Sequence, residues 1–208
     1  AAPSMMVPEA AAAGALYVSA ENAMFNNTFG GVQIVEVVVI GHADETDEAQ
    51  GEPTVKVYEK QLRMAQAIDG NWYGYFGDDT KISAISTTSQ PIGINFGDDY
   101  APSSFPGGVV EGDFLEATSV FAPNADSNND VTILNAPALS NYNNTDATNN
   151  AVNGGEFKGI GQIGVNEETW PFIQTYDLSI ETFDVVYEQA GADEVVTLNY
   201  NSADLDDY

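Results

Sequence analysis

A predicted β-hairpin within residues 53–77 constrains the fold of this chain more than any other stretch of the sequence. At its centre lies Asp69-Gly70, a pair that suits a two-residue type I′ turn because both turn residues must adopt positive φ. This turn would place Ala67 opposite Trp72, with large side chains on both faces of the hairpin. The aromatic residues concerned are Trp72, Tyr73, Tyr75 and Phe76. We therefore expect the hairpin to lie inside a sandwich or beneath a partner, where cross-strand aromatic pairs gain stability.

The rest of the chain has the pattern of short strands separated by turn residues. Apolar and β-branched runs occur at 32–40, 170–177, 183–187 and 194–200. The region 90–155 is rich in Pro, Gly, Asn and Asp, but hydrophobic residues recur along it, which favours short strands joined by long loops over disorder. A chain of 208 residues can bury a full core, so we predict one all-β domain over 21–208, an antiparallel β-sandwich.

The N-terminal segment, residues 1–20, carries an apolar run after its prolines. A glycine within this run and the β-branched Val18 favour an extended segment from about Ala15 onward. Two interpretations remain open for Leu16, Tyr17 and Val18. They form either the first strand of the chain's own sheet, or a donor strand that pairs with an unpaired edge of the next subunit in a filament.

The charge of the chain limits its partners. There are 32 acidic residues and only 5 basic ones, which gives a net charge of −27. Nucleic acid is excluded because phosphate backbones require clustered Lys and Arg, and an anionic membrane surface would repel the chain. No uninterrupted apolar run of membrane-spanning length occurs, so we expect no direct membrane insertion. Divalent cations or a saline medium would relieve the self-repulsion of such an acidic fold.

One stretch has the oxygen spacing of a calcium-binding loop. Asp126, Asn128 and Asp130 alternate as Ca²⁺ ligands do in such loops. Val131 stands where an EF-hand has Gly, and Pro137 stands where it has Glu, so the stretch is not an EF-hand. It is either a different kind of calcium loop, completed by a distant carboxylate, or an Asn/Asp turn that holds no ion.

A second acidic loop, with Asp44 and Asp47, follows the apolar run at 32–40. Its carboxylates are also hard ligands of the kind that a cation such as Ca²⁺ prefers. The alternative is a solvated loop, because charge runs commonly face water. Ca²⁺ is the one cofactor that the sequence suggests.

Two features favour an extracellular location, whereas the cysteine content does not indicate a compartment. The chain contains no cysteine, which excludes disulfides and thiolate metal sites. It begins Ala-Ala-Pro, as expected after removal of a signal peptide. Asn26 and Asn143 each lie in an N-glycosylation sequon, which suits a secreted glycoprotein.

Enzymatic chemistry has little support in the sequence. His42 is the only histidine, so neither a Ser-His-Asp triad nor a histidine-rich metal site can be assembled with confidence, and we interpret His42 as a loop residue. A glycosidase would need two carboxylates in one cleft, but carboxylates are too abundant here for any pair to be informative. We predict that the protein is not an enzyme.

Three groups of motifs resemble a known family. Glu52-Pro-Thr-Val55 after an acidic loop, Asp69-Gly-Asn-Trp-Tyr-Gly-Tyr75 and Trp170-Pro-Phe-Ile-Gln-Thr-Tyr-Asp177 are similar to the N-terminal region of surface-layer and related cell-surface proteins of ammonia-oxidising archaea, the Thaumarchaeota. The resemblance implies a secreted, acidic β-sandwich, Ig-like or jelly-roll-like, that self-assembles on the cell surface, binds divalent cations and draws ammonium towards the cell. Those proteins are far longer, with many domains in series, so a single-domain relative suits a filament better than a lattice.

Two functional hypotheses follow. The first is an extracellular structural subunit, a homopolymer of this chain that forms a cell-surface filament or surface layer stabilised by cations. The alternative is a secreted carbohydrate-binding module in which Trp72, Tyr73 and Tyr75, or Trp170, stack on sugar rings. Exposure separates the two, because sugar binding requires aromatic side chains on an accessible face.

Overall fold

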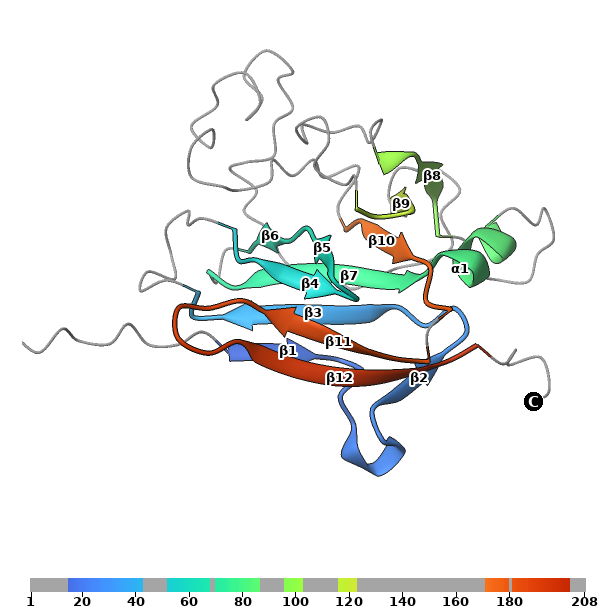
Figure 1. Cartoon of the computed structure of the whole chain (residues 1–208). Helices are drawn as coiled ribbons and strands as arrows, with labels where there is room; N and C mark the ends of the chain where they lie inside the picture. The colour runs from blue at the N-terminus through green and yellow to red at the C-terminus, as the bar shows by residue number, and fades with distance from the viewer. Residues whose placement is uncertain are drawn as a thin grey trace, which may run out of the picture.

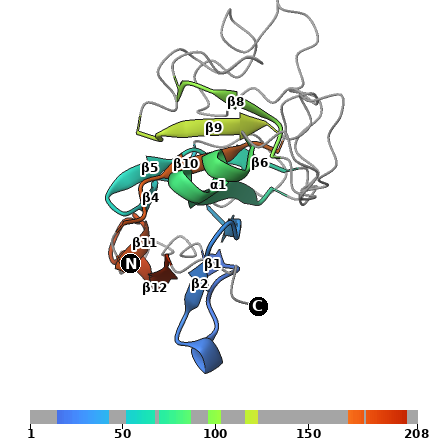
Figure 2. The same ribbon diagram turned by 90° about the vertical axis from the view of Figure 1, so that its right-hand side faces the viewer.

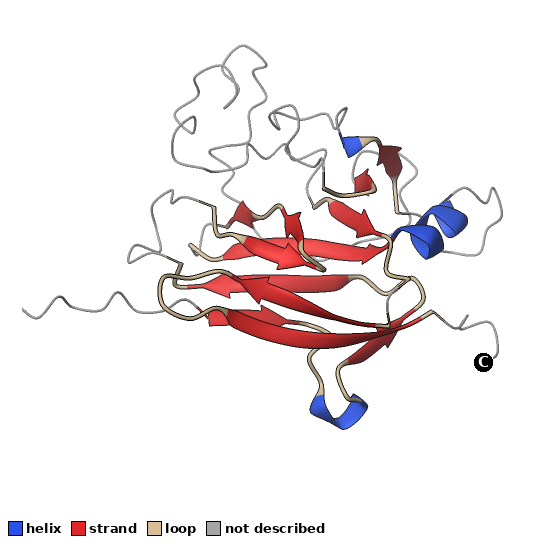
Figure 3. Cartoon of the chain, viewed as in Figure 1, coloured by secondary structure: helices blue, strands red, loops and turns tan. Residues whose placement is uncertain are grey.

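The computed structural model describes residues 15–42, 52–67, 70–86, 96–102, 116–122, 171–179 and 181–202. In this part of the chain two β-sheets pack face to face in a sandwich-like arrangement, with one short α-helix (Figures 1 and 3). The prediction of a mostly β, sandwich-like fold is therefore confirmed.

Sheet A contains β1 (Ala15–Val18), β3 (Val35–Ile40), β6 (Ala65–Gln66), β7 (Trp72–Asp78), β8 (Asp98–Tyr100), β9 (Ser119–Ala122) and β10 (Ile173–Tyr176). Sheet B contains β2 (Thr28–Gly30), β4 (Val55–Val57), β5 (Lys60–Leu62), β11 (Thr182–Tyr187) and β12 (Glu194–Asn201). The 3-10 turn η1 (Ala23–Phe25) precedes β2, and α1 (Asp79–Ser86) follows β7.

Both sheets are mixed, so the prediction of an antiparallel sandwich was wrong at two strand pairs. Sheet A runs in the order β1-β3-β7-β10-β9-β8, with β6 beside the first part of β7, and sheet B in the order β2-β12-β11-β4-β5. The pairs β7–β10 and β2–β12 are parallel. Parallel neighbours need long crossover connections, and in both pairs the partners lie far apart in the sequence. No local pattern in the sequence shows such a pairing.

The central hairpin exists, but its register differs by one residue from the prediction. Ala65 pairs with Tyr73 and Gln66 with Trp72, whereas a two-residue turn would have placed Ala67 opposite Trp72. The Ala67 amide donates a hydrogen bond to the carbonyl of Asn71, so Ala67 faces Asn71 and the loop between them has three residues rather than two. Gly70 has φ of 82°, as expected of the last residue of a three-residue loop with a glycine bulge.

An aromatic cluster joins the two sheets. Phe76 of β7 is fully buried, and its ring centroid lies 6.1 Å from that of Phe29 in β2 and 6.2 Å from that of Phe183 in β11. Tyr176 of β10 and Tyr200 of β12 extend the cluster at centroid distances of 6.4 Å from Phe76 and 5.2 Å from Phe29. The three contacts of Phe76 are edge-to-face, and such contacts add stability beyond the area that they bury.

Helix α1 was not predicted from the sequence. Asp78 is buried, and its carboxylate accepts hydrogen bonds from the amides of Lys81 (3.0 Å) and Leu178 (3.1 Å). The first bond is a helix N-cap, which satisfies an amide that the helix cannot pair itself. Asp78, directly before the first helical residue, is the N-cap signal that sequence reasoning missed.

A glutamine side chain connects the hairpin to β10. Gln174 is fully buried, and its carboxamide accepts a hydrogen bond from the Arg63 amide and donates one to the Arg63 carbonyl, both at 2.8 Å. The guanidinium of Arg63 in turn pairs with Glu52, with Nη2 at 2.8 Å and Nε at 3.0 Å from the carboxylate oxygens. Gln174 thus supplies the two bonds that a neighbouring strand would otherwise supply.

The outer edge of sheet B is also capped by side chains. In β5 the Gln61 amide donates to the Glu116 carboxylate, and the Gln61 carbonyl accepts a hydrogen bond of 2.8 Å from the Tyr176 hydroxyl. Burial, with the nearby charge of Glu116, raises the pKa of the Tyr176 hydroxyl well above its usual value, so it remains a donor. Both backbone groups of Gln61 therefore have partners within the chain.

Candidate functional site

Strand β1 lies at one edge of sheet A, and β8 lies at the other. It pairs antiparallel with β3, from Ala15 opposite Ile40 to Val18 opposite Val37. Leu16 and Val18 point into the core and are buried, whereas the alternate residue Tyr17 is 54% exposed. The prediction that the chain becomes extended from about Ala15 is confirmed.

The structure shows the first of the two alternatives for this segment, because β1 belongs to the sheet of its own chain. Donation of the segment to another copy stays a prediction, as does the division of the chain into 1–20 and 21–208.

The free edge of β1 is guarded by its own chain. The Leu16 amide donates a hydrogen bond of 2.6 Å to the carboxylate of Glu194, which lies at the start of β12 in the other sheet. The Val18 carbonyl accepts a hydrogen bond of 2.9 Å from the amide of Glu21, where the chain turns away. These contacts satisfy edge groups that would otherwise accept an added strand.

Replacing Glu194 with alanine is expected to destabilise this edge. The substitution removes a charged acceptor from the Leu16 amide, which is expected to lower the free energy of unfolding by about 1–2 kcal/mol, because the contact is only partly buried. Hydrogen exchange of the Leu16 amide, followed by NMR, should become faster. Glu194→Gln keeps an acceptor and is the matched control, and unchanged exchange in Glu194→Ala would show that the Leu16 amide has another partner.

The chain between β1 and β2 forms a projecting tip, residues 22–27, in which sequence reasoning singled out only the sequon at Asn26. In Figures 1 and 2 it extends away from both sheets. The Asn22 side chain caps η1 through the Met24 amide at 3.0 Å, and Asn26 and Asn27 turn the chain back with φ of 53° and 51°. Asn tolerates this left-handed conformation better than most residues. The asparagines that flank Met24-Phe25 are therefore the feature of the sequence that could have indicated a tight turn here.

The tip exposes two large apolar side chains. Met24 is 88% exposed and Phe25 is 66% exposed. Five large hydrophobic side chains are exposed in the described part of the chain, and Met24 and Phe25 are two of them. Two more lie close by in the sheet: Tyr17 is in β1, and Ile40 of β3 pairs with Ala15 of β1. Exposed apolar groups thus concentrate on the N-terminal segment and the strand next to it, which is a feature of interaction surfaces.

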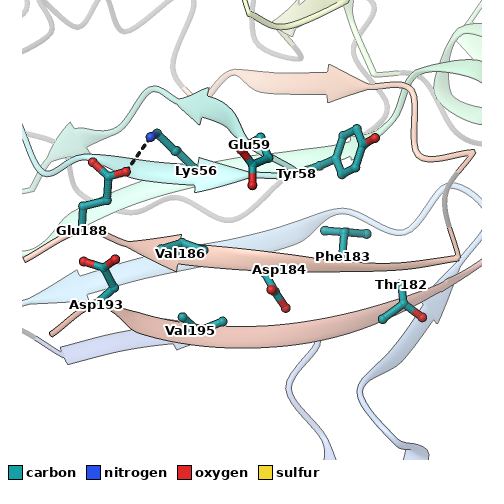
Figure 4. Close-up of a pocket in the computed structure, with 10 residues that line it drawn as sticks. All are labelled: Lys56, Tyr58, Glu59, Thr182, Phe183, Asp184, Val186, Glu188, Asp193 and Val195. Carbon is teal, nitrogen blue, oxygen red and sulfur yellow. Dashed lines mark hydrogen bonds and ion pairs between the residues drawn. The ribbon is translucent and has the colours of Figure 1, made fainter.

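A groove of about 480 Å³ lies on the outer face of sheet B (Figure 4). Its lining includes the acidic residues Glu59, Asp184, Glu188 and Asp193 and the single base Lys56. The Lys56 ammonium lies 2.5 Å from the Glu188 carboxylate, and this hydrogen bond raises the pKa of Lys56. Asp184 is also paired, since it accepts a hydrogen bond of 2.6 Å from the Thr197 hydroxyl. These charges are thus partly satisfied by neighbours.

The aromatic residues proposed for sugar stacking lie mostly in the core. Trp72 and Tyr75 are fully buried, and Tyr73 is half-buried. Trp170 lies outside the described residues. The predicted burial of the hairpin on both faces is therefore confirmed, and neither Trp72 nor Tyr75 presents an open platform to a sugar.

The candidate calcium ligands, Asp126, Asn128, Asp130, Asp44 and Asp47, lie outside the described residues. Among the residues that are described, no group of three or more His, Asp or Glu side chains is arranged to hold a metal ion.

His42 follows β3 and has a structural contact. Its Nδ1 lies 2.7 Å from the Tyr187 hydroxyl, and its ring packs edge-on against Trp72. Burial, with the charge of Glu194, raises the pKa of Tyr187. The contact connects the end of β3 to the end of β11 across the sandwich.

Of the two sequons, the one at Asn26 lies on the tip, where its side chain is exposed. Asn143 lies outside the described residues. Glycosylation of either stays a prediction.

None of the described helices has the length and apolar character needed to cross a membrane. A scan of protein-family models and a search of curated proteins both find no match to this chain.

Proposed function

We propose that this chain is an extracellular structural subunit that assembles with copies of itself, through exchange of β1, into a cell-surface filament or surface layer. The observation that carries the proposal is the position of β1, an edge strand that lies near the start of the chain and contributes Leu16 and Val18 to the core.

Strand exchange suits this geometry because it preserves the pairing of β1. A β1 segment from a neighbouring copy would pair with β3 in the same register, bury the same two side chains and donate to the same Glu194 carboxylate. Exchange of an identical element between copies is a low-cost route to assembly, since the pairing broken within one chain forms again between two chains. Addition of an extra strand outside β1 is less suitable, because Glu194 and Glu21 already occupy edge groups there.

Two further features support the proposal. The aromatic residues of the hairpin serve the core rather than an accessible platform, which favours structure over sugar binding. The charge of −27 requires screening, so the proposal includes a saline medium or divalent cations such as Ca²⁺. The Ig-like or jelly-roll-like class and secretion belong to the same proposal through the resemblance to archaeal surface-layer proteins, and glycosylation at Asn143 belongs to it through its sequon.

Exchange can be tested with the double variant Ala15→Cys, Ile40→Cys. The Ser19 amide donates a hydrogen bond to the Glu36 carbonyl. Hydrogen-bonded and non-hydrogen-bonded pairs alternate along an antiparallel ladder, so Ala15 and Ile40 also form a hydrogen-bonded pair. The Cα atoms of such a pair lie about 5.5 Å apart, which is within the range of a disulfide. The natural chain has no cysteine, so these thiols can pair only with each other. After oxidation of assembled material, non-reducing electrophoresis is expected to show a ladder of covalent oligomers.

The control is the same variant oxidised while dilute and monomeric, which should give an internal disulfide and a chain that forms no filaments or sheets until it is reduced. If assembled material yields only monomers on the gel, β1 remains in its own chain and the exchange proposal is wrong. If electron microscopy shows dispersed particles under all salt and calcium conditions, the structural role itself is wrong.

A further inference from the structure

We propose that the tip, residues 22–27, is a docking contact between two copies of this chain, in which Met24 and Phe25 of one copy pack against the same residues of the other. The inference rests on the proposed function in that it takes the partner to be another copy. It goes further because it assigns a second contact, separate from β1. A contact of a patch with itself has two-fold symmetry and requires no second complementary surface.

The tip is preorganised for such a contact. It is closed by its own hydrogen bonds, from the Phe25 and Asn27 amides to the Asn22 carbonyl and from the Asn22 amide to the Asn27 side chain. The Asn27 side chain also donates to the Thr197 carbonyl at 3.0 Å, which connects the tip to β12. No residue of η1 is buried, so the turn owes its shape to these bonds rather than to the core. A backbone that is already fixed loses little conformational entropy on binding.

Charge identifies the partner. Residues 10–35 contain a single charged side chain, Glu21, although the chain as a whole carries 32 acidic and 5 basic residues. The tip itself carries none. Two copies with net charge −27 repel each other, and the repulsion costs least where uncharged protrusions meet first. A basic partner would instead be drawn to the acidic surface, and an anionic membrane would repel the whole chain.

The contact is small, so it acts together with exchange of β1. Two side chains from each copy bury far less area than a standard stable interface, which predicts weak dimers on their own. When copies are already connected through β1, a second weak contact becomes effectively intramolecular and strengthens the assembly by avidity.

The test uses the double-cysteine variant Ala15→Cys, Ile40→Cys, oxidised as a monomer so that β1 cannot exchange. Sedimentation equilibrium of this chain is compared with the same chain carrying Met24→Ser and Phe25→Ser, with circular dichroism to verify that both are folded. We expect weak dimers for the first chain and a dissociation constant at least tenfold higher for the second.

Salt provides an independent measurement. The repulsion between charges reaches about 10 Å at 0.1 M salt but only about 3 Å at 1 M. An apolar contact between acidic copies should therefore strengthen as NaCl is raised. A contact made by ion pairs would weaken instead, and that result would overturn the inference.

The outcomes separate this inference from the exchange proposal. A locked monomer that does not dimerise at any salt concentration, or serine variants that associate as tightly as the parent, would overturn the tip contact and leave exchange untouched. Binding of the tip to neutral phosphatidylcholine vesicles, without self-association, would equally overturn it. Loss of the disulfide ladder with intact tip-dependent dimers would overturn exchange alone.

Discussion

Replacing Phe76 with alanine is expected to lower the free energy of unfolding by about 3–5 kcal/mol, the range found when a buried Phe is truncated. Phe76 is fully buried, and its ring contacts Phe29 and Phe183 of sheet B and Tyr176 of its own sheet. Alanine removes the ring and leaves a cavity where the sheets meet, and cores relax only partly into such cavities.

Urea unfolding followed by circular dichroism measures this change. Phe25→Ala is the matched control, because the Phe25 ring is 66% exposed and its loss should change stability by no more than about 0.5 kcal/mol. A loss below about 1 kcal/mol for Phe76→Ala would show that the ring cluster does not hold the two sheets together.

The second large effect is expected at Gln174. Replacing it with leucine keeps most of the side-chain volume but removes both hydrogen bonds to Arg63, leaving a backbone amide and a carbonyl without those partners. Each such group costs about 1–3 kcal/mol when it is left unsatisfied away from water, so we expect a total loss of about 2–4 kcal/mol.

Urea unfolding again measures the change. The slope of the unfolding free energy against urea concentration should stay the same, which shows that the denatured state is not altered. Gln33→Leu, at an exposed position, is the matched control. If Gln174→Leu is as stable as the natural chain, water or another group replaces the carboxamide, and Gln174 is not the connection between the hairpin and β10.

Much of the strand content was predictable because local patterns determine it. The start of β1 at Ala15 follows from the change from alanine to larger and β-branched residues. The hairpin of β11 and β12 follows from two β-branched runs around Gly191, whose φ of 120° few other residues adopt. Burial of the central hairpin on both faces follows from aromatic residues at adjacent positions, Trp72-Tyr73 and Tyr75-Phe76, which point to opposite faces.

Other features depend on contacts between distant residues, which local patterns do not encode. The parallel pairing of β7 with β10 depends on a long crossover connection, residues 79–172. The hairpin register depended on whether Gly70 ends a loop of two or three residues, and Asp-Gly is compatible with both. The Leu16–Glu194 contact joins residues 178 positions apart, so no sequence motif indicates it.

The capped edges of the two sheets have a consequence for molecules held close together. Exposed strand edges act as templates on which sheets of neighbouring molecules fuse, and this is a route to amyloid-like aggregation. Here β1 is blocked by Glu194, and β5 is blocked by Glu116 and Tyr176, so one edge of each sheet is closed by its own chain. Copies crowded at high density are therefore expected to resist the addition of foreign strands at these edges.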